Sequence, residues 1–443
     1  MDGGRRLRVP RPPKAVASLL RMAAALLLLA SGCRSAEAMR APGGSLLDRF
    51  TKMMDVESIV KEAERLTFPI DNYWRNFQDK IPESVPFPCE QGKGPLRWRS
   101  EKRPSSVHRL RPGDVDVVGA IGDSITVATA AREFLISLTQ DRGVSFTGGG
   151  LGTWRTITTM PNILKVFNPK LVGYAVGRGD FLSYNAQLNV AITSSIDDDA
   201  FNQVKLFVRK MKQDPRIDFK NDWKVLSIFI GHNDICSMHC LDSVKHSAKA
   251  HQEQLQKALN YLYRDVPRIF VNVVSLIDPT LTARVSMGPL CSMLRRIACS
   301  CLYRGNDYAQ SLVNMSKLVS EYHEAEKELV NSRIYSGRDD FTVELQPFLR
   351  STLGPTTIGE PEKVNVIEYG NKEKPWTPEC FHFNQRGLAS ASILLWNNML
   401  EPVGKKTIKM EKMTHKDMKC PTINAPYLFT KKNSDTYFKT GRQ

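Results

Sequence analysis

Residues 115–124 read VDVVGAIGDS, an apolar run that ends in Gly-Asp-Ser. A short apolar run followed by glycine is typical of a buried strand that enters a turn. A serine at a strand-to-helix turn is accessible, and its backbone N–H lies where the helix dipole favours negative charge. Ser124 is therefore a candidate nucleophile, although Asp and Ser are also ordinary helix N-caps.

Outward from this run, short apolar stretches alternate with amphipathic ones. The candidate strands are residues 115–121, 171–176, 223–230, 268–276 and 341–349, and the candidate helices are residues 199–213, 243–263, 308–332 and 385–400. This alternation predicts an α/β fold with a central, mainly parallel sheet covered by helices on both faces. Functional residues in such folds gather at the carboxyl ends of the strands.

Two further segments carry side chains suited to catalysis. GHND at residues 231–234 follows a candidate strand, and there the Asn233 amide could donate to an oxyanion while Asp234 could orient a histidine. ECFH at residues 379–382 precedes a candidate helix. His382 could serve as a general base held by Glu379. Taken singly, each segment is equally well explained by a turn, a cap or a structural histidine.

In this order the three segments resemble the motif blocks of SGNH (GDSL) hydrolases, and the resemblance extends from about residue 115 to 404. Several short sequence segments are similar to those of phospholipase B/lipase proteins. The segments that carry this similarity are TMPNIL at 159–164, FNP at 167–169, DWK at 222–224, FIG at 229–231, CFHF at 380–383 and LWNNMLEP at 395–402. The resemblance implies a three-layer α/β/α, flavodoxin-like fold and a serine esterase that needs no cofactor or metal.

The resemblance also implies a substrate class and residue roles. The substrates would be fatty-acyl esters of phospholipids and lysophospholipids, attacked by Ser124 with His382 as the base. The backbone N–H groups of Ser124 and Ser194, with the side chain of Asn233, would form the oxyanion hole. Two alternatives stay open: an O-deacylase of acetylated carbohydrates on the same fold, and a weakened member that only binds lipid.

The chain departs from the family's pattern at two positions. Glu379 stands where the family has aspartate, so that Glu379 and Asp234 both remain candidates for the acid of the triad. NVAITS at residues 189–194 resembles the block that lends a glycine N–H to the oxyanion hole, but Ser194 replaces that glycine. If the position needs a positive φ, Ser194 would reduce activity.

Residues 1–38 resemble a secretory signal peptide, because a basic region and a short apolar stretch precede Ala36-Glu37-Ala38. A lipoprotein signal that ends at Cys33 is the alternative. We expect residues 39–111 to form an N-terminal extension packed on the core, with apolar residues at helical spacing over 45–66. The hydrolase domain then covers residues 112–404, and residues 405–443 form a basic tail.

The chain of 443 residues has a formal net charge of +16, and part of this charge lies in the Lys-rich tail. Most such lysines are simply solvated, but a basic surface can also contact anionic membranes. No nucleic-acid-binding motif accompanies the charge, so a nucleic-acid partner is not expected.

Cysteine usage favours an exported protein. Nine cysteines are present, and loss of Cys33 with the signal would leave eight, an even number that indicates disulfides. Eight cysteines allow about 105 connectivities, and the sequence does not choose among them. A zinc site at Cys236, His239 and Cys240 is the less favoured alternative, since no second ligand pair has a matching spacing. One glycosylation sequon begins at Asn314.

Overall fold

The computed structural model describes residues 76–89, 97–133, 139–284, 289–358, 360, 374–377 and 380–443. The expected signal peptide, the helical pattern at residues 45–66 and Glu379 lie outside the described residues.

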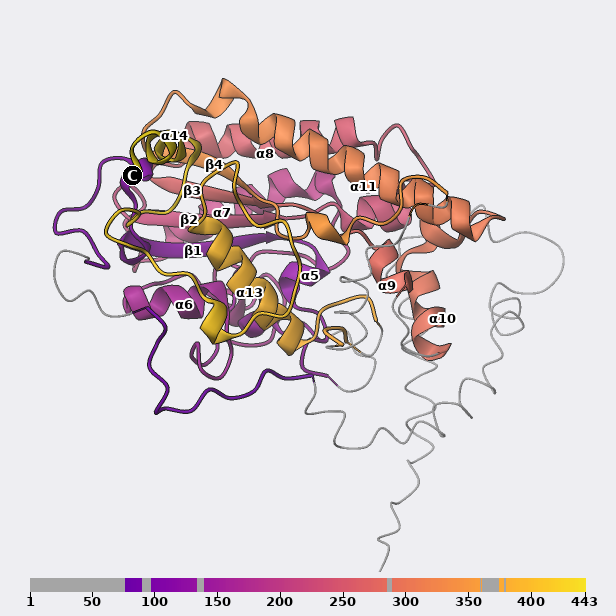
Figure 1. Cartoon of the computed structure of the whole chain (residues 1–443), viewed down its shortest axis with the longest axis horizontal. Helices are drawn as coiled ribbons and strands as arrows, with labels where there is room; N and C mark the ends of the chain where they lie inside the picture. The colour runs from indigo at the N-terminus through magenta and orange to yellow at the C-terminus, as the bar shows by residue number, and fades with distance from the viewer. Residues whose placement is uncertain are drawn as a thin grey trace, which may run out of the picture. The chain divides into compact units, whose positions relative to one another are not determined.

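Four parallel strands form the central sheet, in the order β1-β2-β3-β4 (Figure 1). They are β1 Val115–Gly122, β2 Trp223–Phe229, β3 Ile269–Val274 and β4 Phe341–Gln346. Nearly every strand residue is buried, as expected for a parallel sheet covered on both faces. Four of the five predicted strands are thereby confirmed.

The strand predicted at residues 171–176 is wrong. Only isolated bridges occur there, from Val172 to Val117 and from Ala175 to Gly149. Gly173 between them has φ +94°, and a Cβ at this position would lie 2.3 Å from the carbonyl oxygen of Val118. The chain therefore leaves the strand conformation at Gly173 to approach β1 closely.

Helices cover the two faces of the sheet. They are α6 Met160–Phe167, α7 Ala200–Gln213, α8 Ala248–Asp265, α11 Tyr308–Asn331 and α13 Gln385–Met399. Val117 and Ile121 of β1 pack in one core cluster with α7 and α8, whereas Val118 packs in the other with α6 and α13. Because alternate strand residues face opposite sides, this arrangement is the expected three-layer α/β/α fold (Figure 1).

The helix ends follow local capping. The predictions for residues 199–213, 308–332 and 385–400 agree with the structure within one residue. The prediction for residues 243–263 starts too early, because the Ser247 side chain accepts from the Ala250 N–H and begins α8 there. Four helices were not predicted: α6, α9 Thr280–Arg284, α10 Pro289–Ala298 and α14 Lys431–Thr440.

The basic tail contacts the segment that precedes β1. The Leu428 N–H donates to the carbonyl oxygen of Leu110 over 2.8 Å, and the side chain of Asn433 donates to the carbonyl oxygen of His108 over 3.0 Å. Helix α14 and the C-terminus accordingly lie near the beginning of the strands (Figure 1). The tail is thus more regular than its weak sequence pattern indicated.

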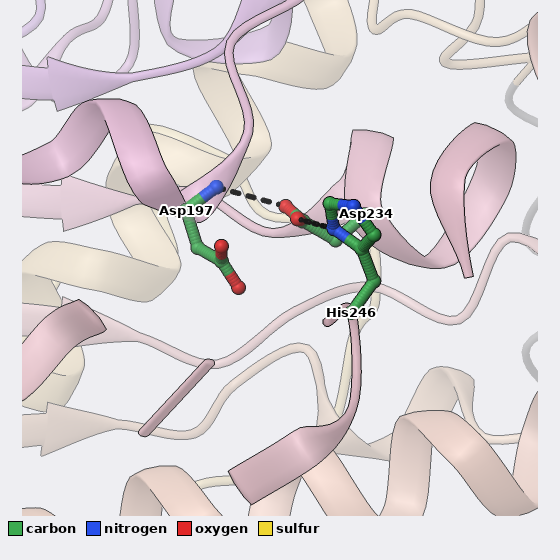
Figure 2. Close-up of side chains that lie close together, drawn as sticks. All are labelled: Asp197, Asp234 and His246. Carbon is green, nitrogen blue, oxygen red and sulfur yellow. Dashed lines mark hydrogen bonds and ion pairs between the residues drawn. The ribbon is translucent and has the colours of Figure 1, made fainter. Parts of the chain in front are cut away.

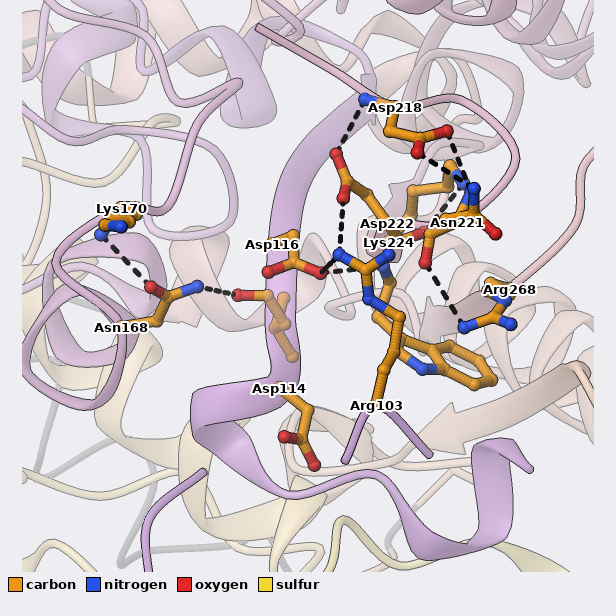
Figure 3. Close-up of polar contacts among 12 residues, drawn as sticks. Arg103, Asp114, Asp116, Asn168, Lys170, Asp218, Asn221, Asp222, Lys224 and Arg268 are labelled. Atoms are coloured by element: carbon orange, nitrogen blue, oxygen red, sulfur yellow. Dashed lines mark hydrogen bonds and ion pairs between the residues drawn. The ribbon is translucent and has the colours of Figure 1, made fainter. Parts of the chain in front are cut away.

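Ion pairs hold the start of β1 against the start of β2 (Figure 3). Arg103 lies 3.1 Å from a carboxylate oxygen of Asp222 and 3.9 Å from one of Asp116. The Lys224 ammonium donates to the carbonyl oxygens of Phe219, Asp222 and Pro267, while burial lowers its pKa to about 8. This network lies at the amino ends of the strands, opposite the carboxyl end of β1 that leads to Ser124.

All eight expected cysteines form disulfides. The pairs are Cys89–Cys420, Cys236–Cys299, Cys240–Cys301 and Cys291–Cys380. The thiols of Cys236 and Cys240 are therefore not available as zinc ligands. Within the described ranges, no helix combines the length and the apolar character that a bilayer span needs.

Candidate active site

Ser124 begins the short helix α5, Ser124–Val127, directly after β1. Gly122 permits the turn, since a Cβ there would lie 2.3 Å from both the carbonyl oxygen of Phe229 and the hydroxyl of Thr126. The Asp123 side chain caps the helix by accepting from the Ile125 N–H over 2.9 Å. The predicted strand-to-helix turn therefore presents the Ser124 hydroxyl at the carboxyl end of β1.

His382 reaches Ser124 across 258 positions of sequence. Its Nε2 atom lies 2.7 Å from the Ser124 hydroxyl oxygen. The backbone around His382 is held by the Thr377 N–H, which donates to the His382 carbonyl oxygen over 2.9 Å, and by Asn384, the N-cap of α13. A neutral imidazole at this distance can accept the hydroxyl proton, so the geometry fits a nucleophile and its base.

Asn233 follows β2 and is half-buried. One N–H of its side chain donates to the carbonyl oxygen of Ser195 over 2.7 Å. A primary amide carries two N–H groups, and the other forms no hydrogen bond to the residues that the structure describes. Asn233 is thus connected to the loop that contains Ser194.

Ser194 has φ +64°, which lies in the left-handed region. The serine therefore adopts the backbone conformation for which glycine is the usual choice, at a cost of about 1–2 kcal/mol. The side chain of Ser194 is exposed.

We expect Ser194→Gly to keep the turnover of the parent chain and to be equally or slightly more stable. Relief of the strained φ outweighs the chain entropy that glycine loses, about 0.5–1 kcal/mol. Ser194→Val should lower kcat and the melting temperature, because a β-branched residue tolerates positive φ poorly. Rates of ester hydrolysis and melting temperatures of the two variants and the parent check this prediction. A valine variant as active as the glycine variant would show that activity does not require a positive φ at residue 194.

Gln203 of α7 joins the turn before Ser124 to the loop that contains Ser194 and Ser195. Its side-chain oxygen accepts from the Gly122 N–H over 2.8 Å, and its amide donates to the Gly122 carbonyl and to the Ser195 hydroxyl, each over 3.0 Å. Sequence reasoning missed this residue. The signal would have been a glutamine on the buried face of an amphipathic helix.

His232 connects the segment before Asn233 to the turn that contains Asp123 and to the segment after β3 that contains Ile277. Its Nδ1 atom lies 3.0 Å from Asp123 Oδ2, and the Ile277 N–H donates to its Nε2 over 3.2 Å. Because Nε2 accepts, Nδ1 carries the proton and donates to Asp123. The buried pair therefore links the residue before Ser124 to the residue before Asn233.

Asp234 lies beside Asn233 but is not joined to His382 by any hydrogen bond between described residues. Its carboxylate instead binds His246 Nδ1 at 2.8 Å and accepts from the Asp197 N–H at 2.9 Å (Figure 2). Burial raises the pKa of Asp234 to about 6, and the hydrogen bond to Asp234 raises the pKa of His246. Asp234 therefore fastens the Asn233 loop to the segment that follows Ser194.

The ligand atoms of Asp197, Asp234 and His246 lie within 4.8 Å of one another, a spacing that suits a metal ion. The contact of His246 with Asp234 uses the ring nitrogen and carboxylate oxygen that a cation would need. We therefore describe the cluster as a hydrogen-bonded network.

His251 extends this network and is fully buried. Its Nδ1 lies 3.2 Å from a carboxylate oxygen of Asp197, and its Nε2 lies 3.7 Å from one of Glu326. Burial alone lowers its pKa, but the two carboxylates outweigh burial and raise it to about 9. His251 is thus positively charged at neutral pH.

We expect the protein to lose stability as the pH rises from 6.5 through 9. A histidine whose pKa is raised on folding stabilises the native state below its unfolded pKa, and this contribution disappears above the folded pKa. The loss should be a few kcal/mol, at about 1.4 kcal/mol per pKa unit. Urea unfolding at pH 6.5 and 9 measures it; Glu326→Gln should show a shallower loss, and equal loss in both proteins would contradict the role of this pair.

Comparison with known proteins agrees with the geometry. A family model described as "GDSL-like Lipase/Acylhydrolase" matches residues 118–392. "Phospholipase B1, membrane-associated" of Mus musculus is 38% identical over 360 residues, which cover 80% of this chain and 23% of that protein. The Homo sapiens protein of the same name is 37% identical over 358 residues, 78% of this chain and 24% of the relative. The chain thus spans about a quarter of the length of these relatives.

Proposed function

The chain belongs to the GDSL-like lipase/acylhydrolase family, and we propose that it is a serine esterase that cleaves fatty-acyl ester bonds of phospholipids and lysophospholipids. The observation that carries this proposal is the 2.7 Å contact between Ser124 and His382. Both similar proteins bear the name phospholipase B1, which supports a phospholipid substrate.

In the proposed mechanism, His382 accepts the hydroxyl proton as Ser124 attacks the acyl carbonyl. The backbone N–H groups of Ser124 and Ser194 and the second side-chain N–H of Asn233 stabilise the oxyanion. His382 then gives this proton to the leaving alcohol, and the acyl group stays on Ser124. In the second half of the reaction His382 accepts a proton from the water that hydrolyses the acyl-enzyme.

Glu379 is the proposed orienting acid of His382. Asp234 was the other candidate, but its carboxylate is engaged by His246 and by the Asp197 N–H. We assign to Asp234 the support of the Asn233 loop instead.

We also propose that the protein is exported and contacts anionic membrane surfaces. The four disulfides support an oxidising compartment. The exposed Asn314 on α11 supports glycosylation of its sequon.

The test is hydrolysis of long-chain lysophosphatidylcholine compared with an acetylated oligosaccharide, both by the purified chain. We expect fatty-acid release with little deacetylation. Preferential deacetylation would establish the carbohydrate O-deacylase instead, and a folded chain that hydrolyses neither substrate would favour a family member that only binds lipid.

A further inference from the structure

Two disulfides fasten a surface beside Asn233 at the carboxyl end of the sheet. A π-helical turn, Asp234–Met238, follows Asn233 directly, and Cys236 within it pairs with Cys299. Four residues later Cys240 pairs with Cys301. We call residues 239–247 together with residues 297–308 the disulfide platform.

The loop half of the platform is held at both ends. Beyond the disulfide of Cys240, the His239 ring bonds the carbonyl oxygen of His246 over 2.8 Å, and the Tyr322 hydroxyl donates to the same oxygen over 2.9 Å. His246 itself binds Asp234. The loop is therefore fixed in position by contacts that lead back to the residue after Asn233.

This fixed loop nevertheless presents aliphatic side chains to solvent. Leu241 is 65% exposed and Val244 is 81% exposed. Single exposed apolar residues are common, but here two lie within four positions of a loop that is anchored on both sides. Because the loop is held at both ends, these side chains stay exposed to solvent.

The second half of the platform, residues 297–308, also exposes apolar and aromatic side chains. Ile297 and Tyr308 are exposed, and the rings of Tyr308 and Tyr303 stack with centroids 5.5 Å apart. The Arg304 guanidinium donates to the Cys240 carbonyl oxygen over 2.8 Å, which joins the two halves. Aliphatic and tyrosine side chains next to a basic group match the boundary between lipid tails and headgroups.

The charges of the platform are balanced. Lys245 and Arg304 are exposed, and so are the carboxylates of Asp242 and Asp307. Lys245 pairs with Asp198 at 3.3 Å, outside the platform. The platform therefore carries little net charge, and its exposed aliphatic and tyrosine side chains carry the fit to a bilayer surface.

Helix α14 of the basic tail lies at the opposite end of the strands from Ser124. Helix α14 lies at the amino end of the strands, where Lys432 pairs with Asp339 at 2.8 Å, whereas Ser124 follows the carboxyl end of β1. Eight strand residues separate the two ends, a span of about 26 Å at about 3.3 Å per residue. Figure 1 shows α14 at one end of the strands, with α5 and α10 towards the other.

We propose that the disulfide platform is the surface by which this protein docks on phospholipid bilayers, with Leu241 and Val244 inserted among the lipids. This inference rests on the proposed function, since a lipid esterase must receive its substrate from such a surface. Docking here places the membrane beside the segment that directly follows Asn233.

The experiment measures binding to sonicated vesicles of phosphatidylcholine with phosphatidylglycerol by sedimentation, using the full chain with Ser124→Ala so that no lipid is consumed. The platform variant adds Leu241→Ser and Val244→Ser. The matched control adds Ile334→Ser and Ile423→Ser, whose side chains are 48% and 65% exposed. We expect the platform variant to bind at least about tenfold more weakly, because two apolar side chains no longer enter the bilayer. The control should bind like the parent.

A second readout separates docking from chemistry. With Ser124 present, the platform variant should hydrolyse a soluble short-chain ester as fast as the parent, while its rate on vesicles falls about tenfold or more. Equal vesicle binding by parent and platform variant, or a loss confined to the control, would overturn the docking proposal. Failure of the parent to hydrolyse any ester would overturn the proposed function instead, and the sedimentation result would still decide the docking surface.

Discussion

Replacement of Ser124 by alanine should abolish fatty-acid release from lysophosphatidylcholine, with kcat lower by about 10⁴-fold or more. The alanine side chain cannot form the acyl-enzyme, and His382 Nε2 loses the hydroxyl that lies 2.7 Å away. Steady-state release of fatty acid, measured at several enzyme concentrations, gives the ratio of kcat values.

The fold should survive this change. Asp123, and not Ser124, caps α5, so alanine is compatible with the first helical position. A melting temperature within a few degrees of the parent would show that the loss is chemical. Undiminished hydrolysis by the folded variant would remove Ser124 from the mechanism.

Replacement of Asn233 by alanine should lower kcat by about 10²–10³-fold, the usual cost of one oxyanion donor. KM should change far less, because the donor acts most strongly on the charge that develops in the transition state. The variant also loses the bond to the Ser195 carbonyl oxygen, so the neighbouring loop is less firmly held. Full kinetics on a soluble ester separate kcat from KM.

Asn424→Ala is the matched control for this measurement, because Asn424 is exposed in the C-terminal tail. It should leave both constants unchanged. A rise in KM with constant kcat for Asn233→Ala would show that Asn233 only binds substrate and does not stabilise the oxyanion.

The sheet was predictable because its strands are buried on both faces. Largely apolar runs such as Val225–Ile230, in which only Ser227 is polar, indicate a parallel strand directly. The segment at residues 171–176 is also largely apolar, yet it pairs only at isolated bridges, because Gly173 approaches the Val118 carbonyl oxygen. Such a close approach depends on the tertiary structure and leaves no local pattern.

The site residues were predictable only through their order along the chain. Ser124 and His382 each have ordinary structural explanations, and the resemblance to a family joined them; the structure then brings the two side chains into contact. Gln203 acts by linking loops that are distant in sequence, so no motif marked it. His232 and Asp234 belong to the GHND segment, but their partners Asp123 and His246 lie outside that segment, so the sequence did not show these contacts.

Covalent labelling tests the central claim most directly. The purified chain is treated with an alkyl fluorophosphonate, with and without excess lysophosphatidylcholine, and the adduct is located by mass spectrometry of its peptides. If Ser124 is a nucleophile activated by His382 and its substrate is lipid, we expect a single adduct on Ser124. Excess lysophosphatidylcholine should suppress this adduct. A folded chain that stays unlabelled, or that carries the adduct on another residue, would contradict a serine esterase built on Ser124.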